Sequence, residues 1–210
     1  MDIGIIGSGN IGGTSARLLA GAGHRVAIAN SRGPESVTEL VAGIEGDVRA
    51  LEVPDALAFG EVVLLAIPFG RYRLIEVAPL QGKVVIDATN YYPERDGELA
   101  ELERGEETSS ALIESELVHA RVVKAINTVY WEHLRDRGTP AGTEGRFAIP
   151  VVGVDAEAKR VVTGLLDDMG FDAVDGGRLE DGFRQQPGTP VYGMEGDADA
   201  VREALASFER

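Results

Sequence analysis

The chain has 210 residues, of which 44% are hydrophobic and 26% charged, a composition typical of a globular protein with a substantial core. Its formal charge of −15 disfavours nucleic acid or an anionic membrane as a partner, because the long-range field would repel both. The absence of cysteine excludes disulfides, thiolate catalysis and cysteine-bound metals. There is no apolar stretch of membrane-spanning length and no secretory-signal pattern at the N-terminus, so we expect a cytoplasmic protein.

Apolar runs of strand length alternate along the chain with segments of helical spacing. The predicted strands are residues 2–6, 26–30, 47–51, 61–67, 83–88, 120–126, 147–154 and 171–175. The predicted helices are residues 10–21, 35–43, 108–117, 129–136 and 155–169. Strands made almost entirely of Val, Ile and Leu are buried on both faces. The pattern therefore predicts an α/β fold, a Rossmann-type doubly wound parallel sheet with a small C-terminal α/β extension.

Two segments depart from this alternation. Residues 89–107 are acidic and lack a regular pattern, so we expect a long exposed loop inserted between a strand and a helix. After about residue 177 the sequence is rich in turn-forming residues until residues 197–210, which have the spacing of a final amphipathic helix with Asp at its start.

Residues 7–12 read GSGNIG and directly follow the first predicted strand. In this GxGxxG pattern Gly7 allows a tight turn, Gly9 lets the backbone approach a pyrophosphate, and Gly12 lets the helix pack closely on the strand. The helix that begins at Asn10 offers unpaired N–H groups to the phosphates. Because strand, motif, helix and second strand follow within 30 residues, the segment predicts a dinucleotide-binding site and not merely a Gly-rich surface turn.

Asn30 ends the second predicted strand, where an acidic residue would select NAD by binding both ribose hydroxyls. The absence of that carboxylate permits the 2′-phosphate of NADP. Ser31 can donate a hydrogen bond to this phosphate and Arg32 can form a charge-assisted fork on it. At about 1.5–3 kcal/mol for a charged hydrogen bond, Arg32 predicts a preference for NADP of about ten- to a hundredfold. The alternative is a simple turn whose arginine is solvated.

With these motifs, LLAIP (64–68), IDATN (86–90) and VVKAINT (122–128), the chain resembles the NADP-dependent oxidoreductases of coenzyme F-420 (F420), a 5-deazaflavin, over residues 1 to about 177. YYPERDG and RQQPGTPVYG are more similar to related small bacterial dinucleotide-binding reductases. The resemblance implies hydride transfer between NADPH and a deazaflavin or related flavin-like acceptor. It also implies an NADP-binding Rossmann domain at residues 1–128 and a small C-terminal α/β part at residues 129–210 that completes the acceptor cleft.

The same resemblance, carried over by matching motif, assigns the site residues. The cofactor-binding set is Gly7, Ser8, Gly9, Asn10, Ile11 and Gly12 at the pyrophosphate, Asn30, Ser31 and Arg32 at the 2′-phosphate, Ala66, Ile67 and Pro68 beside the nicotinamide ribose, and Thr89 and Asn90 near the nicotinamide. The acceptor would lie against the loop Asn127-Thr128-Val129, which makes Asn127 and Thr128 the candidate catalytic residues. Archaeal members of the family have His where this chain has Asn127.

Direct hydride transfer depends on proximity and orientation more than on a dedicated acid or base. None of the three histidines lies at metal-ligand spacing, so we expect no metal. Lys124 and Asn127 could polarise a substrate carbonyl, with Lys124 as proton donor. Alternatively, Lys124 anchors the end of its strand while Asn127 or Thr128 caps the following helix.

Other side chains could contact the acceptor. Arg71 and Arg184 could clamp an anionic group, although exposed arginines are usually solvated. Trp131, Tyr91 and Tyr92 could stack on a planar ring, whereas Trp131 could equally be a core or interface anchor.

Two other functions fit the sequence. One is an imine or carbonyl reductase resembling pyrroline-5-carboxylate reductase, whose longer helical C-terminal domain contrasts with the roughly 80 residues of mixed α/β pattern after Ile126 here. The other is a non-catalytic NADP(H) redox sensor. The expected partners are a small-molecule hydride acceptor and a second copy of the chain in a homodimer. The sequence leaves the acceptor and the physiological direction open.

Overall fold

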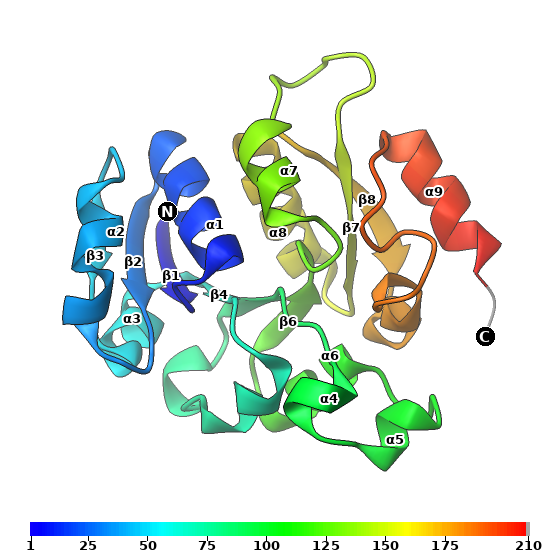
Figure 1. Cartoon of the computed structure of the whole chain (residues 1–210), viewed down its shortest axis with the longest axis horizontal. Helices are drawn as coiled ribbons and strands as arrows, with labels where there is room; N and C mark the ends of the chain where they lie inside the picture. The colour runs from blue at the N-terminus through cyan, green and yellow to red at the C-terminus, as the bar shows by residue number, and fades with distance from the viewer. Residues whose placement is uncertain (209–210) are drawn as a thin grey trace.

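The computed structural model describes residues 1–208, in which eight strands form one continuous sheet of order β3-β2-β1-β4-β5-β6-β7-β8 (Figure 1). The strands are β1 (Asp2–Ile6), β2 (Arg25–Ala29), β3 (Val48–Ala50), β4 (Val62–Leu65), β5 (Val84–Asp87), β6 (Arg121–Lys124), β7 (Ala148–Gly153) and β8 (Asp172–Gly177). Every predicted apolar run forms a strand, and the predicted Rossmann-type α/β fold is confirmed.

The sheet is parallel except at one junction, where β7 runs antiparallel to β6. The predicted parallel sheet is therefore mixed at this one junction. After β6 the chain continues past the carboxyl end of the strand through α7 (Trp131–Asp136) and residues 137–147, and it then returns down the sheet (Figure 1). Because this connection does not lead back to the start of β6, β7 runs in the opposite direction. The pairs Val123–Gly153 and Lys124–Val152 join the two strands.

Helices cover both faces of the sheet. The remaining α-helices are α1 (Asn10–Gly21), α2 (Thr38–Ala42), α3 (Val53–Phe59), α4 (Pro93–Asp96), α5 (Ala100–Glu103), α6 (Ser109–Glu116), α8 (Ala156–Asp168) and α9 (Ala198–Ser207). The 3-10 helices are η1 (Pro34–Val37), η2 (Phe69–Leu74), η3 (Ala78–Leu80) and η4 (Leu179–Gln185). Figure 1 places α1, α7 and α8 on one face of the sheet and α3 and α6 on the other.

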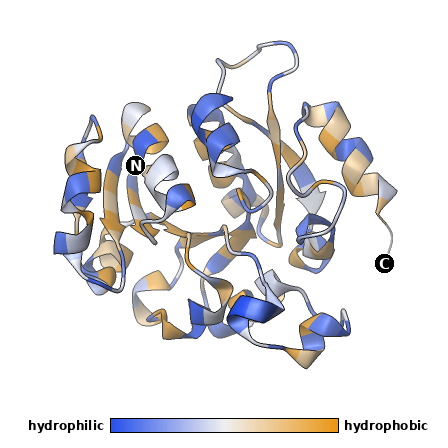
Figure 2. Ribbon diagram, viewed as in Figure 1, coloured by the Kyte–Doolittle hydropathy of each residue, from blue (hydrophilic) through white to orange (hydrophobic). Residues whose placement is uncertain are grey.

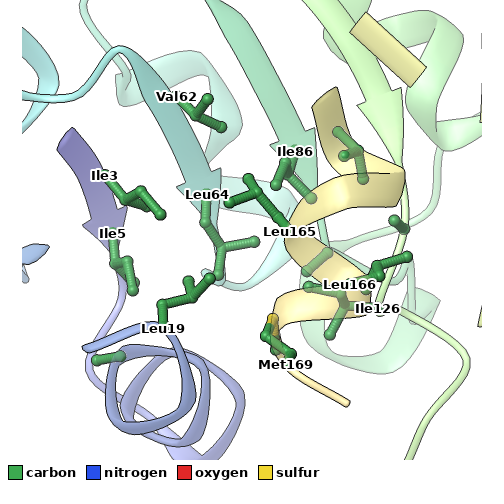
Figure 3. Close-up of a cluster of buried hydrophobic side chains, with 14 of the residues drawn as sticks. Ile3, Ile5, Leu19, Val62, Leu64, Ile86, Ile126, Leu165, Leu166 and Met169 are labelled. Atoms are coloured by element: carbon green, nitrogen blue, oxygen red, sulfur yellow. The ribbon is translucent and has the colours of Figure 1, made fainter. Parts of the chain in front are cut away.

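The two faces of the sheet bury separate hydrophobic clusters. In the first, Ile3 and Leu64 point from the strands toward Leu19 of α1 and Leu165 of α8 (Figure 3). The second lies beneath α3, α6 and η2, and a third, small cluster joins α9 to β7 and β8. Figure 2 shows the hydrophobic strands between helices whose outer surfaces are hydrophilic, most clearly in α4. Burial on both faces of the sheet therefore explains why the strands are apolar along their whole length.

Several local predictions need correction. Helix α3 was not predicted, although Pro54 in its first turn is a helix-start signal. The segment 89–107 was expected to be an exposed loop, but it contains the helices α4 and α5. It also contacts η2, because Asp96 accepts a hydrogen bond from the Gly70 N–H. The predicted terminal helix forms as α9, while residues 209–210 of that prediction lie outside the described residues. The boundary between residues 128 and 129 stays a prediction, and strands from both sides of it share the sheet.

Within residues 1–208, no helix is long and apolar enough to cross a membrane. The same residues contain no group of three or more His, Asp or Glu side chains placed to hold a metal ion.

Candidate functional site

The glycine loop between β1 and α1 is shaped by close backbone contacts. A Cβ atom on Gly12 would lie 1.9 Å from the carbonyl oxygen of Gly7, and one on Gly7 would lie 2.1 Å from that of Ala66. Gly7 also has φ of 115°, which side chains other than that of glycine rarely adopt. At Gly9, by contrast, a Cβ would meet nothing within 4 Å. Gly7 and Gly12 thus build the turn, and Gly9 borders open space.

The first turn of α1 is suited to an anion. Its N-cap residue is Gly9, no side chain caps it, and no acidic residue lies in the first turn. The N–H groups that begin an α-helix have no partners within the helix, and they carry the positive end of its dipole. The predicted pyrophosphate position therefore has exposed donors and no competing carboxylate.

Asn30 joins the glycine loop to the turn that follows β2. Its amide nitrogen donates to Ser8 Oγ at 2.7 Å, and its Oδ1 accepts from the backbone N–H of Arg32 at 2.7 Å and from Ser36 Oγ at 2.9 Å. An aspartate could accept the last two bonds but could not donate to Ser8. The amide therefore fixes the loop that presents Ser31 and Arg32, in addition to removing a negative charge.

Ser31 and Arg32 are exposed at the tip of this turn. No described residue forms an ion pair with the Arg32 guanidinium, although most other arginines of residues 1–208 have carboxylate partners, as Arg49 has in Asp47 and Arg160 in Glu157. In a chain with a net charge of −15, an unpaired arginine beside a dinucleotide loop is available to a phosphate.

A cleft of about 460 Å³ runs from the glycine loop along the carboxyl ends of β4, β5 and β6. Ligands of open α/β sheets bind at this edge. The lining residues are Gly9, Asn10, Ile11, Ala66, Ile67, Pro68, Ala88, Thr89, Asn90, Tyr92, Arg95, Ile126, Asn127, Val129, Tyr130, Trp131 and Tyr192. The cleft thus gathers the predicted residues from four separate motifs, whereas Thr128, 5% exposed, does not line it.

A buried ion pair supports the floor of the cleft. Lys124 at the end of β6 and Asp87 at the end of β5 are 1% and 0% exposed, and their charged atoms are 3.2 Å apart. Lys124 also donates to the carbonyl oxygen of Thr89 at 3.0 Å, and Asp87 accepts from the Thr89 N–H at 2.9 Å and from the Ser110 hydroxyl. Lys124 anchors the strand end and is too deeply buried to be a proton donor for a substrate.

The loop after β6 is held in a strained conformation. Ile126 has φ of 69°, unusual for a β-branched residue, while its side chain lies in the core cluster (Figure 3). Asn127 follows it and donates to the carbonyl oxygen of Gln185 at 2.8 Å and to Asn90 Oδ1 at 3.1 Å. The N-cap residue of α7 is Tyr130, so the prediction that Asn127 or Thr128 caps the helix was wrong.

Two polar atoms at the cleft lack partners. Thr89 Oγ1 and Asn127 Oδ1 are buried without a hydrogen-bond partner among the described residues. Buried polar atoms are normally satisfied, so these two residues retain unused hydrogen-bonding capacity next to the cleft. Thr89 and Asn127 come from neighbouring strand ends, as the sequence motifs predicted.

The far wall of the cleft is aromatic and was only partly predicted. The hydroxyl oxygens of Tyr92 and Tyr192 are 2.5 Å apart, and the Arg95 guanidinium lies 4.9 Å from the centre of the Tyr92 ring. Burial, and then the hydrogen bond with Tyr92, raise the pKa of Tyr192 above its ordinary range. The sequence pointed to Tyr92 and Trp131, but not to Arg95 or Tyr192, which no periodic pattern marks.

Other predicted acceptor contacts lie elsewhere. Arg71 and Arg184 do not line the cleft. Tyr91 packs against Phe69, and its hydroxyl is bonded to the backbone of Gly97 and Leu99. The histidines are likewise outside it: His24 contacts Asp168, and His133 lies near Phe147.

The chain matches known proteins along most of its length. Residues 2–91 match the family model described as NADP oxidoreductase, coenzyme F420-dependent. The F420-dependent NADP reductase of Methanocaldococcus jannaschii is 32% identical over 155 residues, which cover 66% of this chain and 63% of that protein. The chain thus spans less than two thirds of this relative.

Solved structures extend the likeness. A hypothetical protein from Sinorhizobium meliloti is 32% identical, with a TM-score of 0.81 over 93% of this chain and 94% of the other. A candidate F420-dependent NADP reductase from Arthrobacter sp. FB24 is 27% identical, with a TM-score of 0.72 over 85% and 86% of the two chains. Residues 2–91, which carry the glycine loop, the Ser31-Arg32 turn and Thr89-Asn90, are thus the part of the chain that matches the coenzyme F420-dependent NADP oxidoreductase family.

Proposed function

We propose that this protein is an NADPH-dependent reductase that transfers hydride between NADPH and F420 or a related flavin-like acceptor. The observation that carries the proposal is the course of the cleft, which begins at the open Gly9 loop and ends among the rings of Tyr92, Tyr130, Trp131 and Tyr192. A dinucleotide and a planar acceptor are the pair of ligands that such a cleft suits.

The residues present fit NADP. The first turn of α1 offers N–H donors where Gly9 leaves space, and no carboxylate within residues 1–208 pairs with Arg32. The unpaired Thr89 Oγ1 and Asn127 Oδ1 suit an amide-bearing ring such as nicotinamide. When bound, NADPH would supply the hydride. Ser31 and Arg32 would then bind the 2′-phosphate, and Ala66, Ile67 and Pro68 would line the nicotinamide ribose.

The contribution of the chain to the chemistry would be orientation. The Lys124–Asp87 pair fixes Thr89, and the Asn127 amide joins Asn90 to the backbone of Gln185. These contacts hold two strand ends and the C-terminal segment around one cleft. Hydride transfer needs the two rings stacked at close range, and rigid supports of this kind provide the required proximity.

Purified protein with NADPH, scanned against F420, FMN, FAD, ferric chelates and cyclic imines, tests the proposal through the loss of nicotinamide absorbance. We expect turnover with F420 or a flavin, and much weaker activity with NADH. Turnover with cyclic imines alone would replace the proposal by the imine reductase function. Tight NADPH binding without any turnover would favour the redox sensor.

The imine reductase function has less support from the fold. Its resemblance was to a family with a helical C-terminal domain, whereas residues 148–153 and 172–177 of this chain extend the sheet as β7 and β8. The homodimer and the cytoplasmic location remain predictions, as do the exclusions of nucleic acid and membrane as partners.

A further inference from the structure

The cleft contains few groups that could exchange a proton with a substrate. Its titratable lining side chains are Tyr92, Arg95, Tyr130 and Tyr192. An arginine keeps its proton under all ordinary conditions, and the buried Lys124 and Asp87 lie below the floor. A flavin-like acceptor takes up a proton as well as a hydride, and the tyrosines are the side chains that could provide it.

The hydroxyl pair leaves one donor unused. When two hydroxyls form one hydrogen bond, the first proton is spent on the partner oxygen and the second remains available. Either hydroxyl can be the donor in this bond, and when Tyr192 donates to Tyr92 Oη the Tyr92 hydroxyl keeps an unused proton. The Tyr92 proton is then the free one, and no described residue other than Tyr192 forms a hydrogen bond with its oxygen.

A positively charged side chain lies against the ring of Tyr92. Arg95 is positioned over the Tyr92 ring at 4.9 Å, and it is held there by Asp96 and by the carbonyl oxygen of Asn90 at 2.6 Å. The Tyr92 ring therefore has a cation over it, and its hydroxyl has Tyr192 as a hydrogen-bond partner. The turn that carries Tyr92 is fixed as well, because Asp96 accepts from the Tyr92 N–H at 3.0 Å.

We propose that Tyr92 is the proton donor to the hydride acceptor, and that Tyr192 is a positioning residue that binds and orients the Tyr92 hydroxyl. This inference rests on the proposed reductase function. The two tyrosines are 100 residues apart in the chain, and they meet only because the segment after η4 folds back over the cleft.

The proposed step balances in atoms and electrons. NADPH provides the electron pair as a hydride to a ring carbon of the acceptor, and NADP⁺ is left. The conjugated π pair of the acceptor moves to a ring nitrogen or carbonyl oxygen, which forms a bond to the Tyr92 proton as the Tyr92 O–H bond breaks. The Tyr92 phenolate then recovers a proton from water, since the cleft opens to solvent at Tyr130, which is 53% exposed.

The test compares Tyr92→Phe, Tyr192→Phe and the control Tyr91→Phe, whose hydroxyl binds backbone outside the cleft. Tyr92→Phe should lower kcat with F420 by about a hundredfold or more. It should also raise the Kd of oxidised F420, titrated with NADP⁺ present, by about two- to tenfold. The Kd of NADPH should stay unchanged. Tyr192→Phe should lower kcat less than Tyr92→Phe and leave the KM of F420 nearly unchanged, because Tyr92 keeps its proton but loses the partner that orients its hydroxyl.

The outcomes separate this inference from the proposed function. Wild-type protein that binds NADPH but turns over no acceptor overturns the reductase function, and the inference with it. Wild-type turnover that Tyr92→Phe leaves intact, with an unchanged Kd for F420, overturns only the tyrosine assignment. If Tyr92→Phe does not fold, an unchanged kcat in Tyr192→Phe overturns it instead.

Discussion

The two halves of the cleft are built from different interactions. The cofactor half, at the ends of β1 and β2, is held by neutral groups: glycine backbone contacts and the amide of Asn30, which bonds to Ser8 and Ser36. The acceptor half is held by charges, in the buried Lys124–Asp87 pair and in Arg95 with Asp96. The first half therefore has little to titrate, whereas the second depends on the ionisation of its carboxylates.

The halves also differ in how the chain supplies them. The glycine loop and the Asn30 turn lie within residues 7–36, and two strands bring them together. The acceptor half combines residues 87–96, residues 124–131 and residues 185–193, which meet only in the folded sheet. Substitutions of exposed residues in the first half should accordingly affect cofactor binding alone. Substitutions in the second half should change stability and acceptor chemistry together.

The largest expected effect is in the acceptor half. Lys124→Met leaves the Asp87 carboxylate buried without its partner and should lower the free energy of unfolding by about 3–5 kcal/mol. Chemical denaturation at pH 7 measures this change. The control Arg160→Met removes the exposed partner of Glu157 and should cost less than about 1 kcal/mol. Equal losses in the two variants would show that the buried pair does not support the floor.

The second largest effect is expected from substitutions in the glycine loop. Gly12→Ala places a methyl group against the Gly7 carbonyl and should lower the free energy of unfolding by about 1–3 kcal/mol, with loss of NADPH binding. Gly9→Ala meets nothing in the protein, so it should keep its stability yet weaken NADPH binding. Gly21→Ala, in the same helix and also free of contacts, is the control for both measurements. A stable, NADPH-binding Gly12→Ala variant would contradict the packing role of this glycine.

Arg32→Ala should affect the cofactor half without disturbing the fold. Loss of a charged hydrogen bond worth about 1.5–3 kcal/mol should raise the Kd of NADPH by about ten- to a hundredfold and leave the Kd of NADH unchanged. Fluorescence titration with both nucleotides measures the difference. Arg71→Ala, an exposed arginine outside the cleft, is the matched control. Wild-type protein that binds NADH as tightly as NADPH would refute the assignment of Ser31 and Arg32.

Sequence was most informative where the candidate site is built from residues close together in the chain. The GSGNIG loop and Asn30-Ser31-Arg32 were predicted because each glycine and each donor has a task set by its neighbours on one strand–helix junction. The eight strands were predicted for a similar reason, since burial on both faces makes each strand uniformly apolar. The direction of β7 was not, because an apolar run is the same in either direction.

The acceptor half was predictable only in part. Thr89, Asn90 and Asn127 follow strands, and parallel strand ends meet at one edge, so their convergence could be inferred. Tyr192 and Gln185 belong to a turn-rich segment whose path depends on tertiary contacts such as the Gly193 N–H bond to the Thr128 carbonyl at 2.8 Å. The role of Lys124 was predicted as one of two alternatives, an anchor of the strand end or a proton donor. Only its burial in the folded structure decided between them.

The smallest expected effect is a difference between the two halves of the cleft in how their stability depends on pH. Burial alone would raise the pKa of Asp96, but hydrogen bonds from Arg95 and from the N–H groups of Tyr92 and Gly70 hold the pKa below its ordinary range. A depressed pKa stabilises the fold above the unfolded value of about 3.9, and this contribution is lost as the pH falls through the lower folded value.

Asp96→Asn should therefore lower the free energy of unfolding by about 1 kcal/mol at pH 7, and the difference from the wild-type protein should narrow below about pH 4. Hydrogen exchange should show faster opening of residues 91–97 in the variant, with the glycine loop unchanged. The Asn30 network contains no group that titrates there, so its protection should not follow this pH dependence. Equal acid sensitivity in both halves would mean that the acceptor half does not depend on its charges.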